Sequence, residues 1–367
     1  MRVAIIGAGI GGLTAAIGLQ RAGAEVTVLE RARGPAFVGS GLSIFGNGFT
    51  ALDTVGVNLR HLGTPRPDLT TGQRRRDGRW LSVTPAAALT ELRVVHRADL
   101  HRDLAAALKP GTIRYDCPAG SPPEGYDVVV AADGLRSRTR ASWPGDPGIR
   151  YSGYSAWRGV TSTPVDLRGG AGESVGKGER FGLAPLSDGR VYWFGVVSLP
   201  AGTTFPDEYA EVRRRFAGWH APIADLIAAT PAASVFRTDI HDLAGPLPTF
   251  RNSHTVLLGD AAHAMTPDLG QGANQAMEDA ATLTRLLEPL TTRAAPDVSA
   301  ALDAYDRLRR ARTQPIAARA RQVGRVMQSR SPLRDWALRL TPPAVTARQL
   351  TQIQAWQPPT PGQATAR

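Results

Sequence analysis

The sequence predicts an α/β protein, built from a parallel sheet with an inserted antiparallel sheet and helices towards its C-terminal end. Two observations predict this. Three apolar runs of strand length lead into glycine-rich or aspartate-containing turns, as the ends of parallel strands in ligand-binding sheets do. The segment between the second and third of these runs alternates apolar and polar residues instead, which is typical of a half-buried antiparallel sheet. A length of 367 residues favours two domains or one large one.

The first element is an apolar strand over Val3–Ile6, which runs directly into GAGIGG at residues 7–12. A helix follows to about Leu19, and a second strand over Glu25–Leu29 ends at Glu30. Strand, glycine-rich turn, helix, strand and terminal acid together form the βαβ dinucleotide fingerprint of a Rossmann-like domain.

Each residue type in this fingerprint has a physical reason. Gly7 allows the tight turn, Gly9 lets a pyrophosphate approach the backbone, and Gly12 lets helix and strand pack closely. The helix N-terminus offers N–H donors and partial positive charge. Glu30 would accept hydrogen bonds from ribose hydroxyls and repel a 2′-phosphate. This fingerprint alone does not distinguish NAD from FAD.

Two later strands favour FAD. The segment YDVVVAADGLRSRTR, residues 126–140, delivers Asp133-Gly134 at a strand end, and VLLGDAAHAMTPDLGQGANQ, residues 256–275, delivers Gly259-Asp260. Carboxyl ends of parallel strands meet at one edge of a sheet, where ligands bind. A dehydrogenase has no obvious need for these two additional ends, whereas FAD also has a ribityl chain and an isoalloxazine ring to hold.

The three motifs in this order resemble the single-component FAD-dependent aromatic hydroxylases, the p-hydroxybenzoate and salicylate hydroxylase family, with features of its urate hydroxylase branch. The resemblance covers roughly residues 1–325. It implies FAD, with NADH or NADPH as electron donor, and O2-dependent hydroxylation of a small anionic aromatic or heteroaromatic substrate through a flavin C4a-hydroperoxide. Urate hydroxylation specifically, double-bond epoxidation and a non-hydroxylating FAD-binding protein are the alternatives.

The resemblance also implies a set of cofactor-binding residues. Asp260 would bind a ribityl hydroxyl, Pro267 would lie beside the ring, and the helix opening at Gly270–Ala273 would point at its pyrimidine end. Asn274 is either a flavin contact or a helix cap, and Asp133 faces either the FAD pyrophosphate or the nicotinamide nucleotide. The complete expected set is Gly7, Gly9, Gly11, Gly12, Glu30, Arg31, Arg97, Asp133, Gly134, Asp260, Pro267, Gly270, Gln271, Gly272, Ala273 and Asn274.

Three residues are expected at the substrate. Arg180 and Tyr192 flank a hairpin signal at Ser187-Asp188-Gly189, and Asp268 follows Pro267. The urate hydroxylase branch has an Arg, a Tyr and an Asp at matching positions. Arg180 would hold an anionic substrate, and Asp268 could steer a water or a proton.

The same resemblance divides the chain. Residues 1–70, 90–150 and 251–325 would form a discontinuous FAD-binding domain, and 71–89 with 151–250 the substrate domain. Residues 326–356 would be a C-terminal helical segment, and the Pro-rich 357–367 a disordered tail.

Composition excludes several other classes of function. The net charge is +11, but the arginines occur along the whole chain, so no nucleic-acid partner is expected. Cys117 is the single cysteine, His96 and His101 do not share a helix face, and no metal site is expected. No apolar run is long enough to span a bilayer, so no membrane partner is expected. We expect a cytoplasmic monomer or homodimer.

Overall fold

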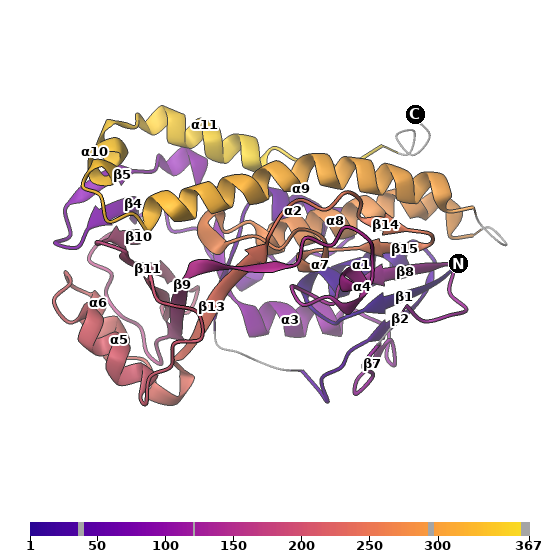
Figure 1. The fold of residues 1–367 in the computed structure, drawn as a ribbon, viewed down its shortest axis with the longest axis horizontal. Helices are drawn as coiled ribbons and strands as arrows, with labels where there is room; N and C mark the ends of the chain where they lie inside the picture. Colours follow the sequence, from indigo (N-terminus) through magenta and orange to yellow (C-terminus); the bar gives the residue numbers. More distant parts are fainter. Residues whose placement is uncertain (36–39, 120–121, 293–296, 361–367) are drawn as a thin grey trace.

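A computed structural model describes residues 1–35, 40–119, 122–292 and 297–360. It confirms the predicted fold class: the chain forms a mainly parallel sheet with helices packed around it and a separate, mainly antiparallel sheet, joined along one side by long C-terminal helices (Figure 1). No helix in the described ranges is long and apolar enough to cross a bilayer.

The first sheet carries the dinucleotide fingerprint. Its strand order is β14-β15-β8-β1-β2-β7, and every pair is parallel except β14 with β15. Helix α1 (Ile10–Arg21) packs against α8 (Gly272–Leu287) and α3 (Arg97–Ala106). The strands are β1 (Arg2–Ile6), β2 (Glu25–Leu29), β7 (Ile113–Arg114), β8 (Val128–Ala131), β14 (Arg251–Asn252) and β15 (Thr255–Leu257).

The second sheet has the order β13-β9-β12-β11-β10-β4-β5. The predicted hairpin is confirmed, since β11 and β12 pair antiparallel across Ser187–Gly189, whereas β4 pairs with β10 in parallel. Aromatic residues pack beneath α5 (Glu208–Phe216) and α6 (Ile223–Ala228). The strands are β4 (Thr70–Arg75), β5 (Trp80–Val83), β9 (Ile149–Val160), β10 (Gly170–Val175), β11 (Glu179–Pro185), β12 (Val191–Val197) and β13 (Phe236–Leu243).

The two sheets are connected by short elements and by α9 (Ser299–Met327), followed by α10 (Leu333–Leu340) and α11 (Pro343–Gln354). The predicted helices towards the C-terminal end are therefore confirmed. Most of the predicted tail, residues 361–367, lies outside the described residues. The remaining elements are β3 (Gly41–Ile44) paired with β6 (Arg93–His96), α2 (Gly46–Thr54), α4 (Arg138–Ala141), α7 (Asp260–His263) and short 3-10 turns at 60–62, 86–88, 232–234, 267–269 and 288–290.

Candidate active site

The glycine-rich turn between β1 and α1 has room for a ligand at one position and none at its neighbours. Gly7 has φ +103°, and a Cβ there would lie 2.5 Å from the Ala132 carbonyl oxygen. A Cβ on Gly12 would lie 2.1 Å from the Gly7 carbonyl oxygen. Gly9, by contrast, is exposed and a Cβ there would meet nothing within 4 Å. The turn is thus closed where the backbone packs and open where a pyrophosphate would approach.

Two carboxylates lie at the strand ends beside this turn. Glu30 accepts from the backbone N–H groups of Ala8 (2.8 Å) and Ala32 (2.9 Å), which fixes it at the end of β2. Asp133 accepts from the backbone of Arg138 at 3.0 Å through Oδ2, while its buried Oδ1 has no partner among the described residues. An orphaned buried carboxylate oxygen next to an open glycine turn fits a ligand that carries hydroxyl groups.

The third strand end is shaped by glycine as well. Gly259 has φ +64° and donates its N–H to Oδ2 of Asp279 at 2.8 Å, and the chain then turns so that Asp260 is exposed. A Cβ on Gly272, the first residue of α8, would lie 3.9 Å from the Asp260 carboxylate. The left-handed Gly270 (φ +61°) ends the 3-10 turn that Pro267 begins. Asp260 and the N-terminus of α8 therefore lie next to one another.

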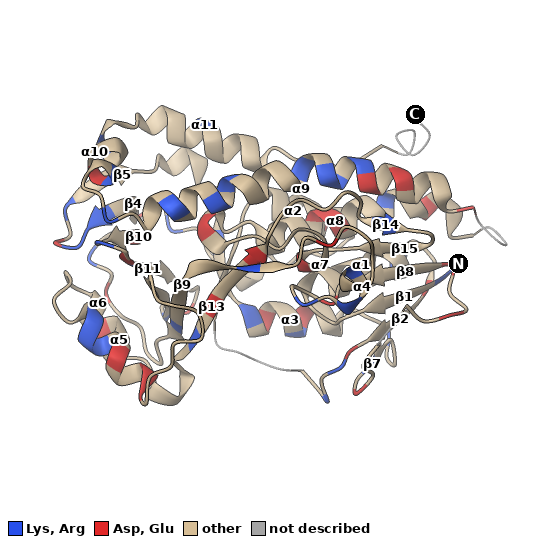
Figure 2. Cartoon of the chain, viewed as in Figure 1, with Lys and Arg blue, Asp and Glu red and all other residues tan. Residues whose placement is uncertain are grey.

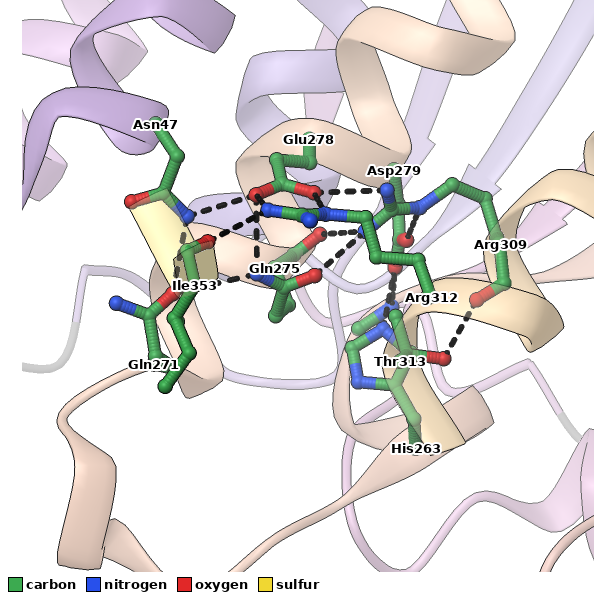
Figure 3. A network of polar contacts seen from close by, with 11 residues as sticks. Asn47, His263, Gln271, Gln275, Glu278, Asp279, Arg309, Arg312, Thr313 and Ile353 are labelled. Atoms are coloured by element: carbon green, nitrogen blue, oxygen red, sulfur yellow. Dashed lines mark hydrogen bonds and ion pairs between the residues drawn. The ribbon is translucent and has the colours of Figure 1, made fainter. Parts of the chain in front are cut away.

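A buried ionic network lies behind these two loops (Figure 3). Arg309 of α9 donates to Asp279 at 2.5 Å and to Glu278 at 2.8 Å, and Arg312 donates to both Glu278 oxygens. The Arg309, Glu278 and Asp279 side chains are at most 2% exposed. Burial would raise the pKa of Asp279, but His263 and Arg309 lower that pKa to about 2, so Asp279 is ionised at neutral pH.

The network holds both ends of residues 259–272 in place. We call this segment, which is expected to bind FAD, the cofactor loop. Asp279 binds the N–H of Gly259 and Nε2 of His263, on the Asp260 side. On the other side, Asn47 bridges Glu278 (2.7 Å) and the side chain of Gln271 (2.9 Å), the residue that caps α8. These buried groups fix the loop and leave Asp260 and the start of α8 free for a ligand.

Arg180 and Asp268, two of the three residues expected at the substrate, are in direct contact. Nη2 of Arg180 donates to Oδ1 of Asp268 in a short ion pair, and Nη1 donates to Glu173 at 3.3 Å. The other Asp268 oxygen accepts from the hydroxyl of Tyr154 at 2.5 Å. Burial would lower the pKa of Arg180, but Glu173 and Asp268 together raise it above its ordinary value. Burial raises the pKa of Glu173 despite the adjacent Arg180.

Close packing of α9 allows this cluster to form. A Cβ on Gly324 would lie 2.4 Å from Oδ2 of Asp268 and 2.9 Å from the Tyr154 hydroxyl. Nε of Arg180 is buried and has no hydrogen-bond partner among the described residues. One donor of the guanidinium therefore remains for another acceptor.

Tyr192 lies on the same sheet face as Arg180 but not beside it. Arg180 is opposite Val196 and Tyr192 is opposite Ala184, so they lie four residues apart along the strands, roughly 13 Å. Phe194 lies between them, with its ring where a Cβ on Gly182 would be. Tyr192 itself packs against the backbone of Gly41, and burial raises its pKa.

Some of the other predicted site residues are exposed, and others are buried among protein groups. Arg31 and Arg97 are exposed, and Arg97 begins α3 with its N–H bonded to the Ser40 carbonyl. The Asn274 side chain is buried and occupied by protein groups: it donates to Ser43 and Gly270 and accepts from the Phe45 N–H. This geometry favours the structural interpretation of Asn274. Gly11 and Gly134 remain backbone positions, Gly11 packing on Leu258 and Gly134 adopting φ +79°.

Residues that the sequence did not indicate are Asn47, Tyr154, Glu173, Arg309 and Arg312. Most of them reach their partners over a long stretch of chain: 231 residues separate Asn47 from Glu278, and 114 separate Tyr154 from Asp268. Glu173, by contrast, lies seven residues from Arg180. A cavity of about 370 Å³ also lies between α7 and α9, lined in part by Leu247, His263 and Arg321. Arg180, Tyr192 and Asp268 do not line it.

Comparisons with protein families and with known proteins agree with the geometry of this site. An FAD binding domain model matches residues 127–320, and an NAD(P)-binding Rossmann-like domain model matches residues 5–53. The aurachin C monooxygenase/isomerase of Stigmatella aurantiaca is 34% identical over 362 residues, covering 92% of each chain. The chain belongs to the FAD-dependent flavoprotein monooxygenases. The FAD-dependent urate hydroxylase of Klebsiella pneumoniae is 33% identical and covers 88% of this monooxygenase and 89% of the relative.

A solved structure supports the cofactor and fold assignments for this monooxygenase. The Klebsiella pneumoniae protein HpxO, complexed with FAD and uric acid, superposes with a TM-score of 0.85 at 28% identity, covering 96% of both chains. FAD is the cofactor. The open turn at Gly9, the orphaned oxygen of Asp133 and the exposed Asp260 fit its pyrophosphate and hydroxyl groups.

Asp260→Ala is expected to weaken FAD binding roughly tenfold to a hundredfold, because one charge-assisted hydrogen bond of about 1.5–3 kcal/mol is lost. Titration of the apoprotein with FAD, followed by flavin fluorescence, measures the change. Asp225→Ala, in the exposed first turn of α6, removes the same charge away from the site and should bind FAD as the parent does. Unchanged affinity in Asp260→Ala would remove Asp260 from the cofactor site.

Proposed function

We propose that this monooxygenase uses NADH or NADPH and O2 to hydroxylate a small aromatic or heteroaromatic substrate bound between Arg180 and Tyr192. The observation that carries the proposal is the Nε of Arg180, which is buried and has no hydrogen-bond partner among the described residues. Arg180 and Tyr192 leave the same sheet face from positions roughly 13 Å apart along the strands, and the aromatic ring of Phe194 between them is a surface on which a substrate ring could stack.

When bound, FAD supplies the redox chemistry, accepting electrons from the nicotinamide and delivering one oxygen atom of O2 to the substrate. The residues of the chain then have a positioning task. Arg180 donates from Nε to an oxygen of the substrate, and Asp268 and Tyr154 hold the guanidinium in place from the other side. Phe194 and Tyr192 provide apolar surface that excludes water from the ring.

The charge of this cluster points to a class of substrate. Arg180 already lies between the carboxylates of Asp268 and Glu173, so its positive charge is offset before any ligand binds. A substrate carboxylate would add a third negative group to one guanidinium. We therefore infer a substrate that presents a ring hydroxyl or carbonyl oxygen to Nε, rather than the carboxylate that an anionic aromatic acid would bring.

Urate hydroxylation is the second candidate. It is favoured by the Arg180, Tyr192 and Asp268 set, which matches the urate hydroxylase branch, and by the 33% identity to the Klebsiella pneumoniae urate hydroxylase. Urate offers ring carbonyl oxygens of the kind that Nε would bind. Epoxidation and a non-hydroxylating role have no comparable support.

A substrate screen tests the proposal. The purified holoenzyme is mixed with phenols, hydroxybenzoates, hydroxypyridines and purines, and NADH or NADPH oxidation, O2 uptake and product mass are recorded for each. We expect stimulated oxidation and a product heavier by one oxygen atom for a compound with a ring oxygen. Stimulation confined to compounds whose only ring substituent is a carboxylate would contradict the proposed contact.

We also infer a cytoplasmic location, where NADH and NADPH are supplied, and a monomer or homodimer. The nicotinamide has no second glycine fingerprint in the sequence, which supports transient binding rather than a permanent second nucleotide site.

A further inference from the structure

Helix α10 exposes apolar side chains and buries a charged one. Leu333, Trp336 and Leu340 recur at helical spacing, a pattern that normally marks a face packed on the core, yet they are 70%, 64% and 58% exposed. The charged Arg334 of the same helix is only 7% exposed. We call Leu333, Trp336 and Leu340 the apolar face of α10. Exposed Val326 and Val345 lie on the neighbouring helices α9 and α11.

The orientation of α10 is fixed by polar contacts on its buried side. Nη1 of Arg334 donates to the carbonyl oxygens of Gly176 (2.6 Å), Met327 (3.1 Å) and Ser329 (3.0 Å). Leu338 packs into a small cluster with Leu81, Val175 and Met327. If this guanidinium turned outwards, the three carbonyl oxygens would lose the donor that satisfies them. The apolar face is therefore held towards solvent.

The charge of the protein is concentrated in the same part of the chain. Residues 307–367 contain twelve arginines and one acidic residue, Asp335, which gives this segment the whole net charge of +11. Residues 1–306 have 31 basic and 31 acidic side chains and are neutral. Figure 2 shows basic residues along α9, with acidic residues near its beginning. At least five of these arginines pair with carboxylates of the protein, so only part of this positive charge is available to a partner; the five are Arg309, Arg310, Arg312, Arg321 and Arg334.

Several of these arginines lie close to the apolar face. Arg330 and Arg339 are exposed, three residues and one residue away from Leu333 and Leu340. Asp335, the single acid, is engaged by Arg334 at 2.7 Å and lies beside Arg75. An apolar stripe containing Trp, flanked by arginine, is the composition of helices that lie in the interface of a membrane with their apolar face among the lipids.

We propose that the apolar face of α10, with Arg330 and Arg339, docks this protein on an anionic lipid bilayer. Anionic headgroups complement the exposed Arg330 and Arg339 and the net charge of +11, whereas a second copy of the chain would bring the same net positive charge against it. The helix docks from outside, since no helix in the described part of the chain is long and apolar enough to span the bilayer. This departs from the expectation that no membrane takes part.

Helix α10 lies at the end of the mainly antiparallel sheet that carries Arg180. Its buried side contacts β5 at the edge of the substrate sheet, and the Val175 beneath it lies opposite Arg180 in the register of β10 and β11. A bilayer on α10 is therefore on the same end of the sheet as the Arg180 cluster. The docking itself does not depend on which substrate is hydroxylated.

Vesicle sedimentation tests the proposal with the FAD-loaded full chain. The protein is mixed with vesicles of pure phosphatidylcholine and with vesicles in which a third of the lipid is phosphatidylglycerol, at low and at high salt. We expect the protein to sediment with the anionic vesicles, to sediment less at high salt, and to remain in solution with the neutral ones. The proposal would be overturned if the protein sedimented equally with neutral and anionic vesicles. It would also be overturned if the protein sedimented with neither kind.

Two variants locate the contact. Leu333→Gln/Trp336→Gln/Leu340→Gln should lower the partition onto anionic vesicles at least roughly tenfold, since binding scales with the buried apolar area. Arg330→Gln/Arg339→Gln should lower it roughly tenfold or more, at about a fivefold loss for each cation near an anionic surface. Arg213→Gln/Arg214→Gln on α5, also exposed, removes the same charge elsewhere and should sediment as the parent does.

All the substituted positions are exposed, so each variant is expected to fold. Its FAD content and its thermal unfolding verify this. If the triple variant sediments as the parent does, the apolar face of α10 is not the contact and the proposal is wrong. If light scattering shows a dimer of the parent that the triple variant loses, the face is an interface between copies and the lipid proposal is likewise wrong.

Discussion

Arg180→Gln is expected to lower the hydroxylated product formed per NAD(P)H oxidised by on the order of a hundredfold, because a displacement of the substrate by about 1 Å is enough to have that effect. Glutamine keeps part of the length of the side chain but lacks the charge and the Nε donor. Reduction by NAD(P)H should continue, so the electrons will appear as hydrogen peroxide. Product and peroxide are measured together, against NAD(P)H consumed, with a substrate found in the screen.

Two further variants make the result specific. Lys177→Gln removes a positive charge from the exposed turn three residues before Arg180 and should leave the product yield unchanged. Asp268→Asn should reproduce the defect, because the Asp268 carboxylate holds the guanidinium. A yield in Arg180→Gln equal to that of the parent would place Arg180 outside the substrate site and make its ion pairs purely structural.

Arg309→Met is expected to destabilise the protein by about 3–5 kcal/mol, the usual cost of leaving a buried charge without its partner. Glu278 and Asp279 are fully buried and would lose the guanidinium that lies between them. Because they hold Gln271 and Gly259 in place, FAD should be lost as well. Urea unfolding gives the stability, and absorbance of the purified protein gives the flavin content.

The neighbouring arginine is the matched control. Arg310 pairs with Asp306 at 2.8 Å on a partly exposed part of α9, so Arg310→Met should cost at most about 1 kcal/mol and retain FAD. If the effect of Arg309→Met is as small as that of Arg310→Met, the network does not stabilise the cofactor loop. Addition of excess FAD should restore part of the stability of Arg309→Met if the variant still folds.

The local parts of the cofactor site could be predicted from the sequence. The tight turn at Gly7, the opening at Gly9 and the close packing at Gly12 depend on residues a few positions apart, and the backbone has the same requirements wherever this motif occurs. The strand end at Gly259-Asp260 was predictable for the same reason. The lengths of the corresponding strands and helices followed from apolar periodicity.

The contacts between distant segments could not be predicted by that reasoning. Arg180 and Asp268 were singled out by resemblance, but their ion pair joins residues 88 positions apart, and Glu173 and Tyr154 carried no signal of their own. Buried charges also look like surface residues in a sequence. Arg309 lies beside Arg310 in the chain, and only tertiary packing makes one the centre of a network and the other half-exposed.

The orientation of helix α10 could not be predicted from its sequence either. Leu333, Trp336 and Leu340 have the spacing that usually marks a face packed on the core, yet all three are exposed. The decisive residue is Arg334, whose backbone partners belong to Gly176, Met327 and Ser329. Nothing in the local sequence of α10 reveals that these carbonyl groups will be beside it.

The parallel pairing of β4 with β10 affects how the protein must fold. Thr70 is opposite Gly170, so closing this pair means bringing together residues 100 positions apart, and the antiparallel hairpins of the same sheet need far less. Such non-local pairing slows folding, because the entropy of a long loop is lost before the contacts repay it. Until β10 arrives, β4 and β5 form an unsupported two-stranded ribbon. Refolding yield should consequently be limited by the joining of these strands, with the open edge of β4 as the point of aggregation.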